Sequence, residues 1–150
     1  MAASLVAYEV ESPDLPELTL GVRRTEDDLA ITEVLGAAFD TPPSSAAILL
    51  GPAHLKCEGI QWHLGKVDEV PVTCALSVVV GDAVGILAVG TVPEARGKGY
   101  GSAATARALT HGFAAGARFG VLTASPEVQG VYERLGFSVV ERWRRLVPTL

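Results

Sequence analysis

Cationic residues, cysteines and long hydrophobic runs are all scarce in this sequence. Its 12 Lys and Arg residues against 17 Asp and Glu residues give a formal net charge of −5. This balance argues against nucleic acid as the main partner, because phosphates need a cationic field. The longest apolar stretches, such as residues 76–80, fall far short of the ~20 residues that a membrane span needs. We therefore expect neither a nucleic-acid nor a membrane partner.

The two cysteines, Cys57 and Cys74, make no disulfide framework and have no companions at metal-ligand spacing. Free thiols are typical of a reducing compartment, and the first residues lack the basic and apolar segments of a secretion signal. The sequence therefore predicts a cytoplasmic protein without a metal site.

Apolar residues are abundant: 49% of the 150 residues belong to the AVILMFWYC set. A chain of this length buries roughly 68–70% of the surface that it exposes when unfolded, which is enough for a core without disulfides or metal. No repeat and no long linker divides the sequence. We expect one domain over residues 1–150.

Residues 1–58 predict short strands and helices. The acidic residues 26–28 suit the positive end of a helix that Thr25 can cap, and apolar residues then repeat at helical spacing. The expected elements are a short edge strand at residues 5–10, a strand at residues 18–23, this helix with Ile31, Val34, Leu35 and Ala38 on one face, and a short helix at residues 44–50.

Residues 59–150 begin with three Val-, Ile- and Thr-rich runs separated by short polar turns, which indicate antiparallel pairing. The expected elements are strands at residues 60–67, 70–80, 83–92, 119–123 and 139–146, a long helix that ends at Gly116 and has Ala103, Ala106, Leu109 and Phe113 on one face, and a helix that Ser125 caps. This order predicts an α/β fold of the mixed α+β kind. Its sheet is mixed but mostly antiparallel, with about six or seven strands and about four helices packed on its faces.

Three alternating glycines, Gly97, Gly99 and Gly101, stand between the third strand and the long helix. Alternating glycines free the backbone to turn its N–H groups inward, and no Cβ blocks a ligand. The helix that follows has unpaired N–H groups and about half a positive charge at its start. Together these features predict a site for phosphate or diphosphate, with Arg96 and Lys98 adding charge at its rim.

Three phosphate-binding motifs can be compared with this loop. A P-loop, GxxxxGK[ST], needs another glycine spacing and a Ser or Thr where Gly99 stands. The dinucleotide fingerprint GxGxxG places its third glycine one residue later than Gly101, and antiparallel strands upstream provide no βαβ unit. The pattern Arg/Gln-x-x-Gly-x-Gly/Ala fits residues 96–101 at every fixed position.

On this motif the sequence resembles the GNAT superfamily of acetyl-CoA-dependent N-acetyltransferases. Downstream, residues 132–137, Tyr-Glu-Arg-Leu-Gly-Phe, are similar to the Tyr-x-x-Leu-Gly-Phe end of the family's second cofactor-contacting helix. The resemblance covers residues 60–145 well and residues 1–58 loosely. It implies a GNAT-like fold, acetyl-CoA as co-substrate and no metal. Residues 1–58 would provide acceptor-side helices and N-terminal strands, and residues 59–150 a cofactor-binding core.

The resemblance also implies roles for particular residues. Main-chain N–H groups of the glycine loop would bind the coenzyme A diphosphate. The pantetheine arm would bind the edge of the preceding strand, in the gap where that strand and residues 119–123 splay apart. Tyr132 would protonate the departing thiolate, since phenol and thiol pKa values are about 10 and ~8.5. The expected cofactor-binding residues are Gly90, Thr91, Val92, Arg96, Gly97, Lys98, Gly99, Tyr100, Gly101 and Ser102.

Several points stay open at this level. Tyr132 can also pack in an apolar helix stripe with Val128, Val131 and Leu135. Ser125 stands where the family often has Asn, and we expect an oxyanion-binding N–H near Thr91 or Val92. The strand at residues 83–92 has no Glu, Asp or His to act as a base. Ordered water is an equal contender to the other base candidates, each of which is more typical of the surface: His54, Glu58, His63, Asp68 and Glu69.

For the other polar and aromatic residues we expect mainly surface or packing roles. His111 is expected on the surface, and Phe39 and Trp62 either line an acceptor pocket or pack. The last strand is expected to carry a solvated basic face, formed by Arg142, Arg144 and Arg145 around Trp143.

The leading hypothesis is an N-acetyltransferase in which a primary amine attacks the thioester directly. The alternatives are a non-catalytic acyl-CoA-binding sensor or partner module with the same fold and, more weakly, a general phosphate-binding α/β domain. The acceptor would be a small-molecule amine or a peptide amine. Residues 39–65 are apolar with few charges, which favours a small, partly apolar amine over a polycation. A homodimer is left open.

Overall fold

The computed structural model describes residues 2–144 and 146–149. The helices and strands, in chain order, are β1 (Ala2–Ala7), β2 (Leu18–Val22), η1 (Thr25–Asp27), α1 (Asp28–Phe39), α2 (Pro43–Ala46), η2 (Ala47–Leu50), α3 (Pro52–Leu55), β3 (Ile60–Val67), β4 (Val70–Val80), β5 (Ala83–Thr91), η3 (Pro93–Ala95), α4 (Tyr100–Ala114), β6 (Phe119–Ala124), α5 (Pro126–Arg134) and β7 (Ser138–Trp143).

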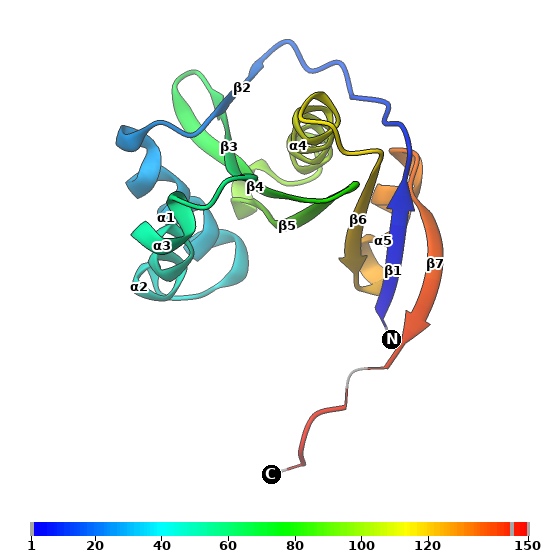
Figure 1. The fold of residues 1–150 in the computed structure, drawn as a ribbon. Coiled ribbons are helices and arrows are strands. Elements are labelled where there is room, and N and C mark those ends of the chain that lie inside the picture. Colours follow the sequence, from blue (N-terminus) through cyan, green and yellow to red (C-terminus); the bar gives the residue numbers. More distant parts are fainter. Residues whose placement is uncertain (1, 145, 150) are drawn as a thin grey trace.

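The strands form one seven-stranded sheet in the order β2-β3-β4-β5-β6-β1-β7 (Figure 1). Neighbouring strands run antiparallel, except that β5 and β6 are parallel. The parallel pair follows from the connection through α4, which returns the chain in the same direction. The predicted mixed, mostly antiparallel sheet with helices on its faces is confirmed.

Two hydrophobic cores lie against the sheet. One contains residues of α4, the central strands and the segment after α5, with Leu5, Leu109 and Phe137 among its buried side chains. The other contains residues of α1, α2 and η2 packed on β3 and β4, with Trp62 and Ile31 almost fully buried. In Figure 1 α4 lies above the sheet and α1, α2 and α3 lie below it. The meander β3–β4–β5 thus separates the two cores.

The N-terminal strand differs from its prediction. β1 covers Ala2–Ala7 and lies between β6 and β7, whereas the sequence predicted an edge strand at residues 5–10. Ala3, Leu5 and Ala7 alternate into the core, and the two alanines carry too little apolar bulk to mark a strand in the sequence. The interior position depends on pairing with β6, which is a long-range contact.

Helix ends also differ in detail. Thr25 is not the cap of the first helical segment: Arg24 is, and its main-chain N–H donates to Asp27 Oδ2 at 2.8 Å. Ser125 does stand at the N-cap of α5, but its side chain makes no capping hydrogen bond. The short helix α3 was not predicted. β7 ends at Trp143, so the last strand is shorter than predicted, and Arg145 lies outside the described residues.

Candidate functional site

The site begins where β5 and β6 separate. Their parallel pairing ends at Gly85 and Val121, so the rest of β5 has a free edge on that side. The register between β4 and β5 also skips a residue, because Cys74 pairs with Gly90 whereas Leu76 pairs with Leu87. The expected splay is therefore present, and it coincides with a β-bulge in β5.

The bulge turns the backbone of β5 locally. Ala88 and Val89 both lie opposite Ala75, and Ala88 has a left-handed φ of 49°. Such a conformation is uncommon for a residue with a side chain and occurs often beside functional sites. The bulge takes main-chain groups of Ala88 and Val89 out of the β4 ladder, next to the gap between β5 and β6.

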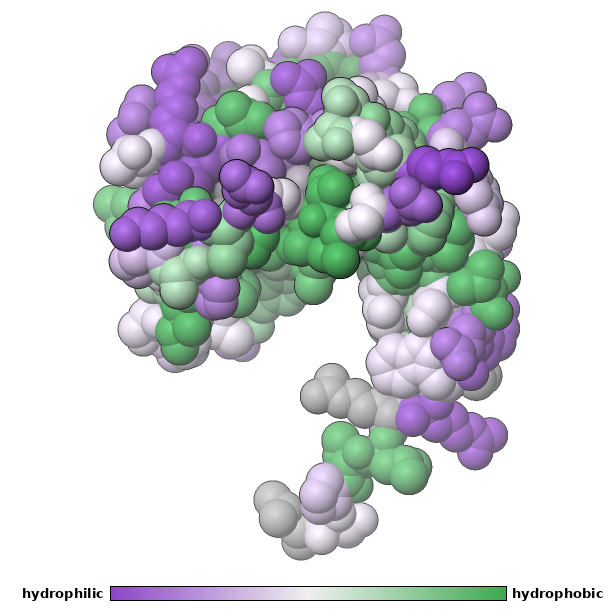
Figure 2. All heavy atoms as spheres, in the orientation of Figure 1, coloured by the Kyte–Doolittle hydropathy of each residue, from purple (hydrophilic) through white to green (hydrophobic). Residues whose placement is uncertain are grey.

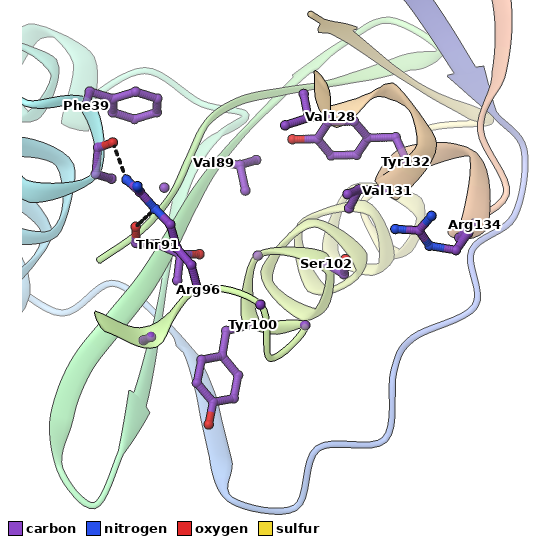
Figure 3. A pocket seen from close by; sticks show the side chains of 16 residues that line it. Phe39, Val89, Thr91, Arg96, Tyr100, Ser102, Val128, Val131, Tyr132 and Arg134 are labelled. Atoms are coloured by element: carbon purple, nitrogen blue, oxygen red, sulfur yellow. Dashed lines mark hydrogen bonds between the residues drawn. The ribbon is translucent and has the colours of Figure 1, made fainter. Parts of the chain in front are cut away.

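A cleft of about 450 Å³ opens along this free edge (Figure 3). Its walls are the end of α1 on one side and α5 on the other, and the glycine loop with the first turn of α4 forms one end. The lining residues are Ala38, Phe39, Val89, Gly90, Thr91, Ala95, Arg96, Gly97, Gly99, Tyr100, Gly101, Ser102, Val128, Val131, Tyr132 and Arg134.

The glycine loop has the geometry of an anion cradle. Gly97 and Gly99 have φ values of 78° and 85°, which favour glycine, and α4 begins directly afterwards at Tyr100. A Cβ at Gly97 would meet nothing within 4 Å, and one at Gly101 would reach Thr91 Oγ1 at 3.2 Å. The loop therefore leaves room beside the unpaired N–H groups that begin a 15-residue helix.

Most of the sequence-predicted cofactor residues line this cleft. Val92 and Lys98 do not. The Val92 N–H donates to the Val72 carbonyl at 2.9 Å and its side chain is buried in the core beneath α1. The N–H of Val92 therefore points to β4 and is not free to bind an oxyanion, contrary to the expectation. Sequence reasoning missed Val89, since a bulge arises from strand pairing.

Two predicted residues line the cleft in an unexpected way. The Tyr100 side chain points away from it (Figure 3) and its hydroxyl lies 3.4 Å from Glu17 Oε1, so only the main chain of Tyr100 faces the cleft. The Arg96 guanidinium donates to the carbonyl oxygens of Ala38 at 2.9 Å and Thr91 at 3.3 Å. Arg96 thus ties the loop to α1 and to the end of β5.

Tyr132 projects from α5 into the cleft. Its ring packs on the core and meets Phe137 edge to face, with ring centroids 6.0 Å apart. Burial raises the pKa of the Tyr132 hydroxyl above its ordinary value, so the group keeps its proton at neutral pH. The sequence left open whether Tyr132 packs in the core or lines the cleft. The structure shows that it does both.

A second cavity, of about 350 Å³, continues from the cleft into the gap between β5 and β6. The two cavities share Phe39, Val89, Val128 and Tyr132. Ser125 lines the second cavity and not the cleft. The other lining residues are Ile86, Leu87, Ala88, Leu122, Thr123 and Ala124. Of the two aromatic residues in question, Phe39 lines both cavities and Trp62 is buried in the core.

Neither cavity is lined by an Asp, Glu or His in the part of the chain that the structure describes. Among the base candidates, His63 is fully buried beneath α4, contrary to the expectation of a surface residue. Its Nε2 lies 3.0 Å from Ser77 Oγ, and burial, assisted by His111 and Arg107, lowers the pKa of His63 to about 4. The other base candidates are exposed and lie outside both cavities: His54, Glu58, Asp68 and Glu69.

His111 is also not a free surface residue. It is half-buried, and its ring centroid lies 5.2 Å from that of His63. In β7, Arg142 is exposed and its Nη1 donates to Gln129 Oε1 at 3.1 Å. Both cysteines are free thiols, Cys57 exposed and Cys74 buried. Within the described residues, no helix is both long and apolar enough to cross a bilayer, and no three His, Cys, Asp or Glu residues gather as metal ligands would.

A family model described as the acetyltransferase (GNAT) family matches residues 30–137 of this chain. Among solved structures, a GCN5-related N-acetyltransferase from Kribbella flavida is 28% identical with a TM-score of 0.70, over 93% of this chain and 55% of that one. An acetyltransferase from Trypanosoma brucei is 27% identical with a TM-score of 0.71, over 87% and 99% of the two chains. No curated protein sequence matches the chain.

The aminoglycoside N-acetyltransferase AAC(6')-Iy, in complex with a bisubstrate analog of CoA and acetylneamine, has a TM-score of 0.75 and covers 89% of this chain and 99% of its own. Its identity to this chain is 18%, so the likeness shows the fold alone. The chain studied spans about half the length of the Kribbella protein, at 55%.

Proposed function

Because this chain belongs to the acetyltransferase (GNAT) family, we propose that it transfers the acetyl group of acetyl-CoA directly to a primary amine. The observation that carries the proposal is the continuity of the glycine cradle, the free edge of β5 and Tyr132 around one cleft. Solved relatives include N-acetyltransferases, one of them in complex with a CoA-linked amine analogue.

Binding of acetyl-CoA would use main-chain groups more than side chains. The N–H groups that begin α4, in the positive field of the helix, would bind the diphosphate. Arg134 lines the same end of the cleft and adds a cation. The pantetheine arm would lie along Val89, Gly90 and Thr91, which line the cleft where β5 has no partner strand on that side.

The transfer step needs an electrophile, a nucleophile and a proton for the leaving group. The amine nitrogen would bond to the acetyl carbon while a main-chain N–H of the bulge at Ala88 and Val89 stabilises the charge on the carbonyl oxygen. The C–S bond then breaks, and the thiolate takes the proton of the Tyr132 hydroxyl. The proton lost by the amine passes to water, the Tyr132 phenolate takes a proton back from water, and the products are the N-acetylated amine and coenzyme A.

The experiment is a thiol-release assay with acetyl-CoA and a panel of primary amines, paired with a thermal unfolding measurement. We expect acetyl-CoA to raise the unfolding temperature and at least one amine to accelerate thiol release. The expected shift is a few degrees at a saturating concentration. Absence of a shift at millimolar acetyl-CoA would overturn the proposal.

A second candidate function is acyl-CoA binding without transfer. The lack of an Asp, Glu or His around either cavity, among the residues described, favours it. A protein of this kind would show the thermal shift with acetyl-CoA but release no thiol with any amine. The paired measurement therefore separates the two functions.

A further inference from the structure

The two connected cavities differ in the charge of the side chains that line them. The cleft ends at Arg96 and Arg134, two cations beside the helix N-terminus where an anion would bind. The second cavity is lined, over the described part of the chain, by no Asp, Glu, Lys, Arg or His. Its polar side chains are the hydroxyl groups of Thr123, Ser125 and Tyr132. A polycation in this cavity would leave water without finding a countercharge, which is costly.

Large apolar side chains remain exposed around the second cavity. Phe39 from α1, Leu87 from β5 and Val128 from α5 are 51%, 49% and 40% exposed, and all three line it. In Figure 2 hydrophobic residues are visible at the head of the hollow that separates the two parts of the molecule. Apolar residues from three separate elements that meet in one hollow are typical of a ligand site.

Strand alternation places Leu87 in this hollow, on the face of β5 opposite the buried side chains of Val84 and Ile86. Leu87 is the last residue of β5 paired with β4 before the register skips, and β6 has already diverged at Gly85. No strand lies beside Leu87 on the β6 side, which explains why a leucine in the middle of a seven-stranded sheet is half exposed. Its side chain therefore forms part of the cavity wall rather than of the core.

We infer that the second cavity binds the body of the acetyl acceptor, and that this acceptor is an apolar primary amine, of the arylalkyl or alkyl class, rather than a polycation. The inference rests on the proposed function and deepens it. The apolar body would lie between Phe39, Leu87 and Val128, and the amino group would point toward Tyr132, where the two cavities meet.

This chemistry also accounts for the missing base. An alkylammonium group has a pKa of about 10 in water, and transfer into an uncharged apolar cavity disfavours its charged form. The amine therefore enters as the neutral nucleophile, having left its proton in water. No carboxylate or imidazole is then needed at the reacting nitrogen.

The first test compares two acceptors and two variants. The probes are 2-phenylethylamine and spermidine, each with acetyl-CoA. Leu87→Glu places a carboxylate in the cavity wall, and Val80→Glu places one at a 71% exposed residue at the end of β4, outside both cavities. We expect wild-type kcat/KM to favour 2-phenylethylamine, and Leu87→Glu to lower that kcat/KM on the order of tenfold or more while Val80→Glu leaves it unchanged.

Two outcomes would overturn the inference and leave the proposed function intact. One is acetyl transfer with spermidine preferred and unaltered by Leu87→Glu. The other is a change in the preference for hexanoyl-CoA over acetyl-CoA in Leu87→Glu with the amine preference intact, which would assign the cavity to the acyl chain.

If no amine releases thiol, the proposed function fails. The preference of the second cavity for an apolar amine is then tested by measuring binding alone. Calorimetry of 2-phenylethylamine with the CoA-saturated protein would then show binding that Leu87→Glu abolishes and Val80→Glu retains. Absence of binding to the wild type would overturn the inference.

A second test uses pH and a matched pair of amines. 2-Phenylethylamine and its β,β-difluoro analogue have similar shapes, but fluorine lowers the pKa of the amino group. We expect the rising limb of kcat/KM against pH to move down by the difference between the two amine pKa values. A limb that stays at one pH for both amines would reveal a titrating base on the protein and would overturn the account of the missing base.

Discussion

Arg96 and Ala38 are joined on one side of the cleft, since the guanidinium Nη2 donates to the Ala38 carbonyl oxygen at 2.9 Å. The Nε of the same guanidinium donates to the Thr91 carbonyl at 3.3 Å. These bonds link the glycine loop to the last turn of α1 and to the end of β5 (Figure 3). The arginine that the motif supplies for an anion thus also holds the shape of the loop.

This dual use leads to a prediction for Arg96→Lys. Lysine keeps the positive charge but has no planar fork to reach two carbonyl groups at once. We expect Arg96→Lys to weaken coenzyme A binding nearly as much as Arg96→Ala, by roughly tenfold, in calorimetry. Near wild-type affinity in Arg96→Lys would show that the charge alone matters.

Gly101→Val tests the cradle. Gly101 lies in the first turn of α4, where a Cβ would stand 3.2 Å from Thr91 Oγ1 and the branched side chain would extend into the cleft. We expect the variant to fold and to lose the rise in unfolding temperature that coenzyme A produces. Gly130→Val is the matched control, because Gly130 is also a helix glycine but lines neither cavity, and its nearest neighbour is Arg134 Nη1 at 3.6 Å.

Tyr132→Phe removes a proton donor and little else. The ring would keep its contact with Phe137, while the thiolate would leave without a proton from the enzyme. We expect kcat to fall by about 10²–10⁴-fold and coenzyme A affinity to change by less than about twofold. Tyr8→Phe, at a 75% exposed tyrosine, should leave both unchanged. Unaltered turnover in Tyr132→Phe would remove the acid role.

The burial of His63 leads us to predict that the free energy of unfolding falls in acid. Burial lowers the pKa of His63 from 6.5 to about 4, so the unfolded chain binds more protons than the folded chain between these values. The stability that this residue contributes is complete above pH 6.5 and is lost as pH falls toward 4. The difference amounts to roughly 3 kcal/mol in the free energy of unfolding.

The measurement is urea unfolding at pH 7 and at pH 4.5. His63→Gln cannot titrate and retains a donor for Ser77, so we expect a smaller loss of stability on acidification than in the wild type. His54→Gln, at an exposed histidine, should lose as much as the wild type does. An equal loss in His63→Gln would assign the acid sensitivity to other groups.

The meander and the loop could be predicted because their signals are local. β3, β4 and β5 match the predicted strands to within a residue, since runs of Val, Ile and Thr between short polar turns specify both strand type and pairing. The conformation of the loop at residues 96–101 is likewise set locally, because glycines at positive φ followed by the start of a helix need no distant partner. The expectation that Tyr132 lies at the site came from its family pattern, and the structure places its side chain in the cleft.

Tertiary structure alone decided where the chemistry can occur. The bulge at Ala88, the divergence of β6 after Gly85 and the exposure of Leu87 all result from pairings between strands far apart in the sequence. The same pairings bury His63, which the sequence could not distinguish from a surface histidine. Local preferences select the elements and the anion cradle, whereas the register between strands decides which edge stays free and therefore what can lie beside Tyr132.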